Sequence, residues 1–154
     1  MNEDLEIPAE SIAAIYAEKI RTLRTRSCTL EIPERENDVE IHHTLLGIEL
    51  QVGRRRFSCP DLATARYMRV FARLGSREFA IPYDITKIST LADELETAWQ
   101  RSVLMLENEA AVKGEDQRKR HRSRLYKLAR SAVAEIGPGE RMPEFKQSTK
   151  QRNP

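Results

Sequence analysis

The order of apolar and polar positions along the chain predicts a mixture of helices and strands. Apolar residues recur at helical spacing from Pro8 to Arg26, with a proline in the first turn and arginines near the end, and predict a helix there. The run Cys28–Ile32 alternates as a strand does. Stronger alternation over residues 38–59 predicts further strands joined by a hairpin. Its turn is either at Gly47 or in the run GRRR at 53–56, and the pattern leaves both open.

The second half of the chain predicts three helices and one short strand. These are a helix over Pro60–Leu74 with Gly75 as its C-cap, a strand over 77–82, a helix over 88–112 with a Thr90–Asp93 capping box, and a helix over Glu115–Ile136 after Gly114. The two long helices either pair as an antiparallel hairpin or merge and project.

The elements together predict an α+β fold. It comprises an N-terminal helix, a small antiparallel sheet of three to four strands, a helix and a short strand, and then two long C-terminal helices. We expect one domain over residues 1–136, with a candidate break at 112–116 before the basic C-terminal helix. Residues 137–154 are polar and contain proline, and we expect them to form a disordered tail.

Composition places the chain among soluble globular proteins. It has 154 residues, of which 40% are hydrophobic and 32% charged. No apolar run approaches the roughly 20 residues that a membrane span needs. The acidic start MNEDLEIPAE differs from a signal peptide, and two cysteines do not make a disulfide framework. We therefore expect a reduced cytoplasmic protein.

Charge is distributed unevenly, although the net charge is only +2. The net charge is −5 over residues 1–40, +4 over 41–82, −4 over 83–112 and +7 over 113–154. Such blocks favour internal charge matching or a surface with separate acidic and basic faces.

Two groups of arginines are candidates for binding anions. One group follows Gly53, and the other occupies a single face of the helix predicted at 60–74, opposite Met68 and Phe71. Guanidinium groups pair with phosphates in a bidentate fork, and no acidic residue lies one helical turn away. We expect replacement of the helix arginines by glutamine to leave folding intact. The alternative is that these arginines dock on the acids of the 83–112 helix. The candidates are Arg54, Arg55, Arg56, Arg66, Arg69 and Arg73.

The strongest basic signal lies near the C-terminus. Residues 118–130 are basic almost all round a helix for two turns, a density that a polyanion or an acidic partner would neutralise. A solvated helix end is the simpler explanation. The binding candidates here are Arg118, Lys119, Arg120, Arg122 and Arg124.

Cys59 is a candidate reactive thiol. If Pro60 is the first helical residue, then Cys59 is the N-cap, where the helix dipole lowers the pKa of a thiol. The alternative is a small buried residue at the end of a strand, and no histidine lies near it in sequence to act as a base.

The pair His42–His43 invites a metal hypothesis, but adjacent strand residues point to opposite faces. His43 shares the register of Val39 and Ile41 and is predicted to be a core histidine. No set of ligands appears at a recognisable spacing, so we expect neither a metal nor a cofactor.

No nucleotide-binding or hydrolase motif is present, and we expect no enzymatic activity. The first hypothesis is a small accessory or regulatory protein that binds the phosphate backbone of nucleic acid through the arginine-rich surface. The second is a protein–protein interaction or self-association module that uses its long C-terminal helices and charge blocks. The third is a thiol-dependent enzyme at Cys59. A continuous exposed arginine patch would favour the first hypothesis, and arginines paired with acids the second. The predicted partner-helix face consists of Leu125, Leu128, Ala132 and Val133.

Overall fold

The computed structural model describes residues 11–139, without the side chains of 109–113, and the fold is α+β as predicted. Five strands in the described residues form two antiparallel sheets, β1–β5 and β2–β3–β4, where the sequence predicted one sheet. The helical elements are α1 (Ile12–Ile15), a π-helical turn η2 (Tyr16–Ile20), α2 (Leu62–Leu74), a 3₁₀ turn η3 (Ile85–Lys87), α3 (Ile88–Lys113) and α4 (Glu115–Ile136). The strands are β1 (Thr25–Thr29), β2 (Val39–Thr44), β3 (Gly47–Val52), β4 (Arg55–Cys59) and β5 (Glu78–Pro82).

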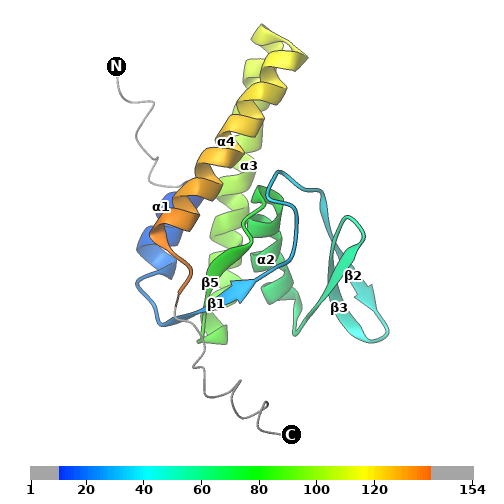
Figure 1. Cartoon of the computed structure of the whole chain (residues 1–154), viewed down its shortest axis with the longest axis vertical. Helices are drawn as coiled ribbons and strands as arrows, with labels where there is room; N and C mark the ends of the chain where they lie inside the picture. The colour runs from blue at the N-terminus through cyan, green and yellow to red at the C-terminus, as the bar shows by residue number, and fades with distance from the viewer. Residues whose placement is uncertain (1–10, 140–154) are drawn as a thin grey trace, which may run out of the picture.

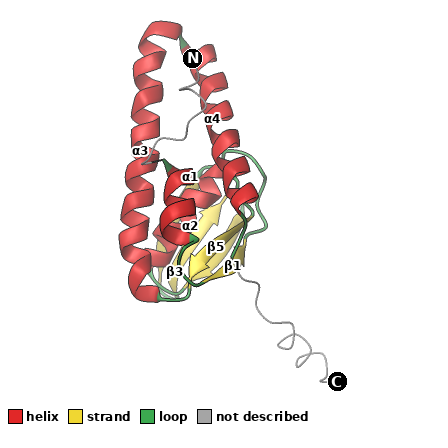
Figure 2. Cartoon of the chain, turned by 90° about the vertical axis from the view of Figure 1, so that its left-hand side faces the viewer, coloured by secondary structure: helices red, strands yellow, loops and turns green. Residues whose placement is uncertain are grey.

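Helix α2 occupies the centre of the fold. It packs against strands β2, β3 and β4 on one side and against α3 and α4 on the other (Figure 1). The chain reverses at Gly114, so α3 and α4 form an antiparallel hairpin, which settles the alternative that the sequence left open. The far half of this hairpin extends well beyond the strands (Figures 1 and 2).

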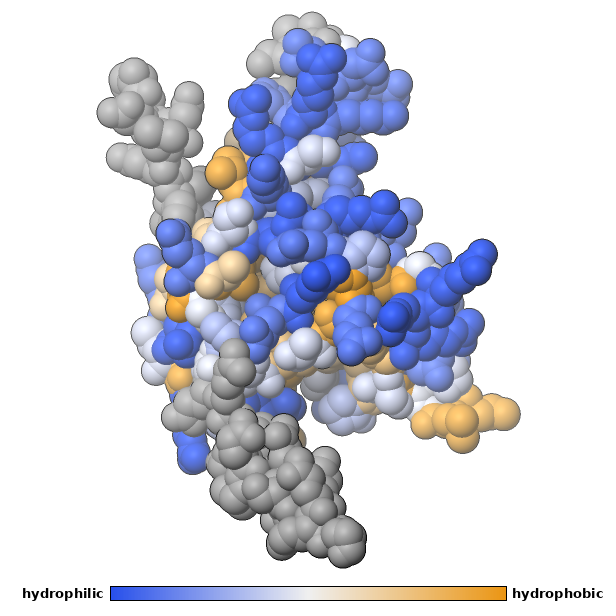
Figure 3. All heavy atoms as spheres, viewed as in Figure 1, coloured by the Kyte–Doolittle hydropathy of each residue, from blue (hydrophilic) through white to orange (hydrophobic). Residues whose placement is uncertain are grey.

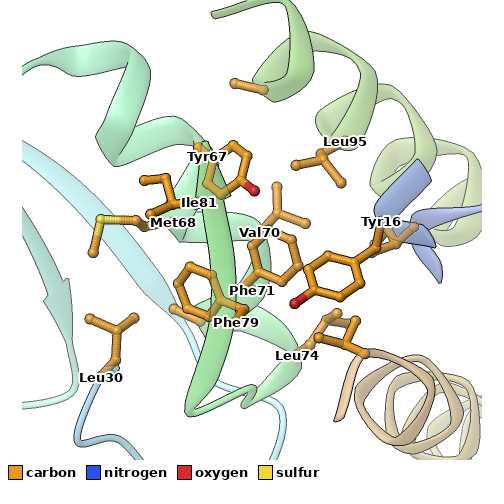
Figure 4. Packing of buried hydrophobic residues seen from close by; sticks show 14 of the residues in the cluster. Tyr16, Leu30, Tyr67, Met68, Val70, Phe71, Leu74, Phe79, Ile81 and Leu95 are labelled. Carbon is orange, nitrogen blue, oxygen red and sulfur yellow. The ribbon is translucent and has the colours of Figure 1, made fainter. Parts of the chain in front are cut away.

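Aromatic side chains from α2 and β5 form the middle of the core (Figure 4). The rings of Phe71 and Phe79 are stacked with centroids 4.5 Å apart, and Tyr16 meets Phe71 edge to face at 5.6 Å. All three side chains are fully buried. Aromatic pairs in such arrangements stabilise a core by about 0.5–1.5 kcal/mol beyond the area that they bury.

Two buried tyrosines take the place of a third strand beside β5. The backbone N–H of Ala80 donates to the Tyr16 hydroxyl at 2.8 Å, and the Tyr67 hydroxyl donates to the Ala80 carbonyl at 2.6 Å. The Tyr16 hydroxyl in turn donates to the carbonyl of Gly137 at 2.5 Å. The backbone N–H and C=O of Ala80, on the free edge of β5, therefore both have hydrogen-bond partners. The Tyr16 hydroxyl also links the first helical turns to Gly137, near the other end of the described chain.

Helix α2 begins and ends at residues suited to those positions. The side chain of Asp61 accepts a hydrogen bond from the backbone N–H of Thr64 at 2.7 Å, so Asp61 is the N-cap. The prediction that Cys59 is the N-cap is wrong, because Cys59 is the last residue of β4. Gly75 ends the helix with φ of 83°, and a Cβ there would lie 2.3 Å from the backbone oxygen of Arg35. Both the backbone angle and the close approach require glycine.

The N-terminal elements differ from their predicted bounds. Helical structure covers Ile12–Ile20 and ends earlier than Arg26, while residues 8–10 lie outside the described residues. The chain leaves the helix because Thr25–Thr29 pairs with β5, which also places the strand earlier than the predicted Cys28–Ile32. Leu30 and Ile32 are nevertheless buried.

Both candidate hairpin turns exist, because the second sheet contains two hairpins. Leu45 and Leu46 link β2 to β3, and Gly53 and Arg54 link β3 to β4. His43 lies beside the first turn and is exposed, so the prediction of a core histidine is wrong.

Two further predictions at helix ends are corrected. Thr90 lies inside α3, and the turn before that helix is capped by Asp84, whose carboxylate accepts from the N–H of Thr86 at 3.0 Å. Gly137–Gly139 are not a free tail, since a Cβ on Gly139 would lie 2.6 Å from Thr25 Oγ1. The rest of the predicted tail, 140–154, lies outside the described residues. Within the described chain, no helix combines the length and apolarity that crossing a membrane requires.

Candidate interaction surfaces

The arginines of α2 face α3, where acidic residues bind them. Arg66 donates to both carboxylate oxygens of Glu96, with Nη2 2.7 Å from Oε1, and also contacts Asp93. Arg69 Nη2 donates to the second Glu96 oxygen at 2.8 Å. The three side chains of Arg66, Arg69 and Glu96 are only 18–25% exposed. These arginines therefore hold α2 to α3.

The protonation equilibria of this cluster follow from the same contacts. Burial by itself raises the pKa of Glu96, but the hydrogen bonds from Arg66 and Arg69 outweigh it, so the pKa is lowered. Hydrogen bonds to Glu96 and Asp93 raise the pKa of Arg66. Each contact thus favours the charged form of its partner.

Arg73, the third arginine of this face, lies over an aromatic ring. Its guanidinium carbon is 5.1 Å from the centroid of Trp99, which itself stacks on Tyr126 at 4.8 Å. Burial, followed by repulsion from Arg69, lowers the pKa of Arg73. The stack joins α2, α3 and α4. Because all three α2 arginines have structural partners, the prediction that their replacement leaves folding intact is not supported by these contacts.

The arginines at the β3–β4 turn are exposed but partly neutralised. Arg55 donates to Glu31 at 3.2 Å, and Arg56 donates to Glu49 on the neighbouring strand at 3.1 Å. Arg54 is exposed in the turn. Exposed pairs of this kind contribute about 0–1 kcal/mol each and leave the side chains available for other ligands.

The basic run of α4 divides into paired and exposed residues. Arg118 pairs with Glu115, and Arg122 pairs with Glu36, each at 3.2 Å. The exposed members make no ion pair with another residue of the described chain: these are Lys119, Arg120, Arg124 and Lys127. The first three belong to the first half of α4, which directly follows the reversal at Gly114.

The predicted partner-helix face on α4 is only partly exposed. Leu125 and Leu128 are 40% and 60% exposed, Ala132 is half-buried, and Val133 is a core residue. Val133 is therefore not part of a partner face, because it packs inside the domain.

Further exposed apolar side chains lie outside that predicted face. On α3, Leu104 and Met105 are 59% and 64% exposed. Both fall outside the helical phase of the buried residues Leu95 and Leu106, which is the sequence signal that could have identified them. Two leucines at the β2–β3 turn are also almost completely exposed.

Cys59 lies in surroundings that disfavour a thiolate. Burial, followed by repulsion from Cys28 and Asp61, raises the pKa of the Cys59 thiol to about 11. Its Sγ lies 3.8 Å from the carbonyl of Phe57 and 4.0 Å from the sulfur of Met68. This is the environment of a structural cysteine, and both cysteines are free thiols.

The histidines of β2 are not arranged as metal ligands. His42 Nε2 lies 2.6 Å from the side-chain oxygen of Gln51 and 3.2 Å from Glu40. His43 is on the other face of the strand. Among the side chains that the structure describes, no group of three or more histidine, cysteine or acidic residues could hold a metal ion.

Comparison with protein-family models, with curated proteins and with solved structures gives no match to this chain.

Proposed function

We propose that the protein is a protein–protein interaction module whose docking element is the far half of the α3–α4 hairpin. The observation that carries this proposal is a set of exposed apolar side chains on α3 and α4. These two helices form a hairpin that extends beyond the strands (Figure 2). The set consists of Leu104, Met105 and Leu125 in the far half of the hairpin, with Leu128 one helical turn nearer the strands. A two-helix hairpin has only one internal seam, so side chains on its outer flanks are covered only by another molecule.

The charge pattern supports an acidic protein as the partner. Lys119, Arg120 and Arg124 are exposed next to the apolar positions of α4, and they would steer an acidic surface toward the hairpin. The pairing of Arg66 and Arg69 with Glu96 removes two arginines from a common anion-binding surface. Fully burying one leucine is worth about 1.5–3 kcal/mol, so a few such residues give modest affinity and the charges supply orientation.

A pull-down with a matched pair of variants tests the proposal. We expect Leu125→Ser with Leu128→Ser to abolish capture of an acidic partner from nuclease-treated lysate. The control is Leu45→Ser with Leu46→Ser, which removes two leucines that are even more exposed and lie at the β2–β3 turn, away from the hairpin. The captured protein is then purified and titrated against both variants. Equal binding by the two variants would mean that the hairpin is not the docking element.

Nucleic acid is a second candidate ligand for the same hairpin, supported by the exposed run of Lys119, Arg120 and Arg124. Binding to phosphates would follow counterion release, so the logarithm of affinity for duplex DNA would fall linearly with the logarithm of salt. Each arginine or lysine replaced by glutamine would reduce that slope by about one unit. Nuclease treatment would then abolish capture, whereas capture of an acidic protein would survive it.

A further inference from the structure

The two sheets lie beside one another with an open cleft between them. The cleft has a volume of about 570 Å³, which is within the range of ligand-binding sites. Its lining comes from the chain just after β1, from the start of β4 and from the residue before β5: Leu30, Glu31, Ile32, Pro33, Arg55 and Arg77. Figure 3 shows one face of the molecule, on which a patch of hydrophobic side chains is bordered by hydrophilic ones.

Strands β1 and β4 are neighbours that do not pair. The Arg55–Glu31 contact joins the start of β4 to the end of the β1 segment. At the other end of β4, Cys59 belongs to the same hydrophobic cluster that Cys28 of β1 packs against. The two strands nevertheless belong to separate sheets.

The edge of β1 that is turned away from β5, and the edge of β4 that is turned away from β3, carry free backbone groups. In an antiparallel pair, alternate residues point their N–H and C=O groups toward the partner strand and away from it. The Ala80 N–H points to Tyr16, so its opposite residue Ser27 directs its backbone groups away from β5. On β4, Arg55 closes the two-residue turn and is hydrogen-bonded to Val52 of β3. Because the direction alternates, Arg56 and Ser58 direct their backbone N–H and C=O groups away from β3. No hydrogen bond within residues 11–139 satisfies these groups of Ser27, Arg56 or Ser58.

The rim of the cleft is basic. Arg77 uses Nε to donate to the carbonyl of Ile32 at 2.7 Å, and its terminal amino groups make no hydrogen bond to the described residues. Arg54 and Arg55 are exposed at the adjacent turn, and Glu31 is the acid among the lining residues. Buried Leu30 and Ile32 provide the apolar floor.

We infer that an extended, acidic segment of a partner protein binds in this cleft as an added strand between β1 and β4. Its backbone would pair with both free edges and join the two sheets into one. Alternate side chains would face opposite ways, with apolar ones on Leu30 and Ile32 and acidic ones toward Arg55 and Arg77. The surface is separate from the α3–α4 hairpin, so this inference does not depend on the proposed function.

Amide hydrogen exchange measured by NMR tests the inference with a defined probe. The probe is the blocked hexapeptide Glu-Val-Glu-Ile-Glu-Val, added to the isotope-labelled full chain. We expect at least tenfold slower exchange at the amides of Ser27, Arg56 and Ser58. A peptide with lysine in place of glutamate, and one with N-methylated amides, should each leave exchange unchanged. Absence of slower exchange with the acidic peptide would overturn the inference.

Two variants separate strand addition from other binding. Ser58→Pro removes one free-edge N–H without removing a β3–β4 hydrogen bond, since proline is accepted on edge strands, and it should abolish the slowed exchange. Arg55→Glu should weaken binding of the acidic peptide at least tenfold and allow the lysine peptide to bind. If Ser58→Pro fails to fold, Arg55→Glu still decides. Unchanged binding by the folded variants would refute strand addition. Protection that grows with protein concentration without peptide would show that a second copy fills the cleft, and would also refute it.

Discussion

The ion pairs of Glu96 offer the sharpest test of how the domain is held together. Replacing Glu96 by glutamine removes the charge that Arg66 and Arg69 share, while keeping the shape of the side chain. A hydrogen bond to a charged group contributes about 1.5–3 kcal/mol, and breaking a fully buried ion pair costs about 3–5 kcal/mol. Because these side chains are 18–25% exposed, solvent screening lowers the cost, and we expect about 2–3 kcal/mol.

Thermal and urea denaturation followed by circular dichroism measure this loss. For a domain of this length, about 2–3 kcal/mol corresponds to a fall in Tm of about 5–10 °C. The matched control is Asp93→Asn, since Asp93 also contacts Arg66 but is 65% exposed, and we expect it to cost less than about 1 kcal/mol. A loss for Glu96→Gln no larger than that of the control would refute the reasoning. That result would also mean that Arg66 and Arg69 are available to bind anions.

The same cluster gives a pH dependence with a definite sign. The pKa of Glu96 is lowered in the folded protein, so its contribution is complete above the ordinary glutamate pKa of about 4.3 and is lost as pH falls through the lowered value. The wild type should therefore lose more stability than Glu96→Gln as pH decreases below about 4.3. Parallel stability curves for the two proteins would contradict the assignment.

Three further outcomes are expected. Gly75→Ala should cost more than about 3 kcal/mol in urea denaturation, because its Cβ would collide with the backbone of Arg35. Gly53→Ala, at a positive φ of 62° but with open space around its Cβ, should cost about 1 kcal/mol. Equal losses for the two variants would contradict this reasoning. Thiol titration under denaturing, non-reducing conditions should count two free thiols, and a count of zero would contradict this expectation. In the native protein, Cys59 should react far more slowly at pH 7 than near its pKa of about 11. Rapid reaction of Cys59 at neutral pH would contradict the raised pKa. Replacing Leu45 and Leu46 by serine should change Tm by less than about 2 °C, since both side chains are 95% or more exposed, and a larger fall would mean that the turn depends on them.

Elements that are bounded by glycine, proline or a capping residue could be predicted from the sequence. Helix α4 has the predicted bounds, Glu115–Ile136, because glycines flank both ends, and β5 ends at Pro82 as expected. The start of α2 was predicted two residues early, although aspartate at position 61 is a stronger N-cap than cysteine. There the signal was present in the sequence and was misread.

Features that depend on long-range contacts could not be predicted. The N-terminal helix ends early because Thr25–Thr29 pairs with Glu78–Pro82, a strand that follows much later in the chain. The helical faces of Arg66 and Glu96 were visible in the sequence, but periodicity does not specify which helices pack together. The pairing of arginines with acids was accordingly one of two open alternatives. The gap between the two sheets is likewise a property of the assembled domain.

The hydrogen bond between Tyr16 and Gly137 has a consequence for biosynthesis. It joins residues 121 positions apart, so the first helical turns can reach their final place only after α4 has been made. At ribosomal rates of about 5–20 residues per second, that interval lasts roughly 6–24 s. During this time the apolar face of Ile12, Ile15 and Ile20 lacks its α4 neighbours. A chain stalled before α4 would present that face to chaperones and proteases, so translation speed through the C-terminal third bears directly on the yield of folded protein.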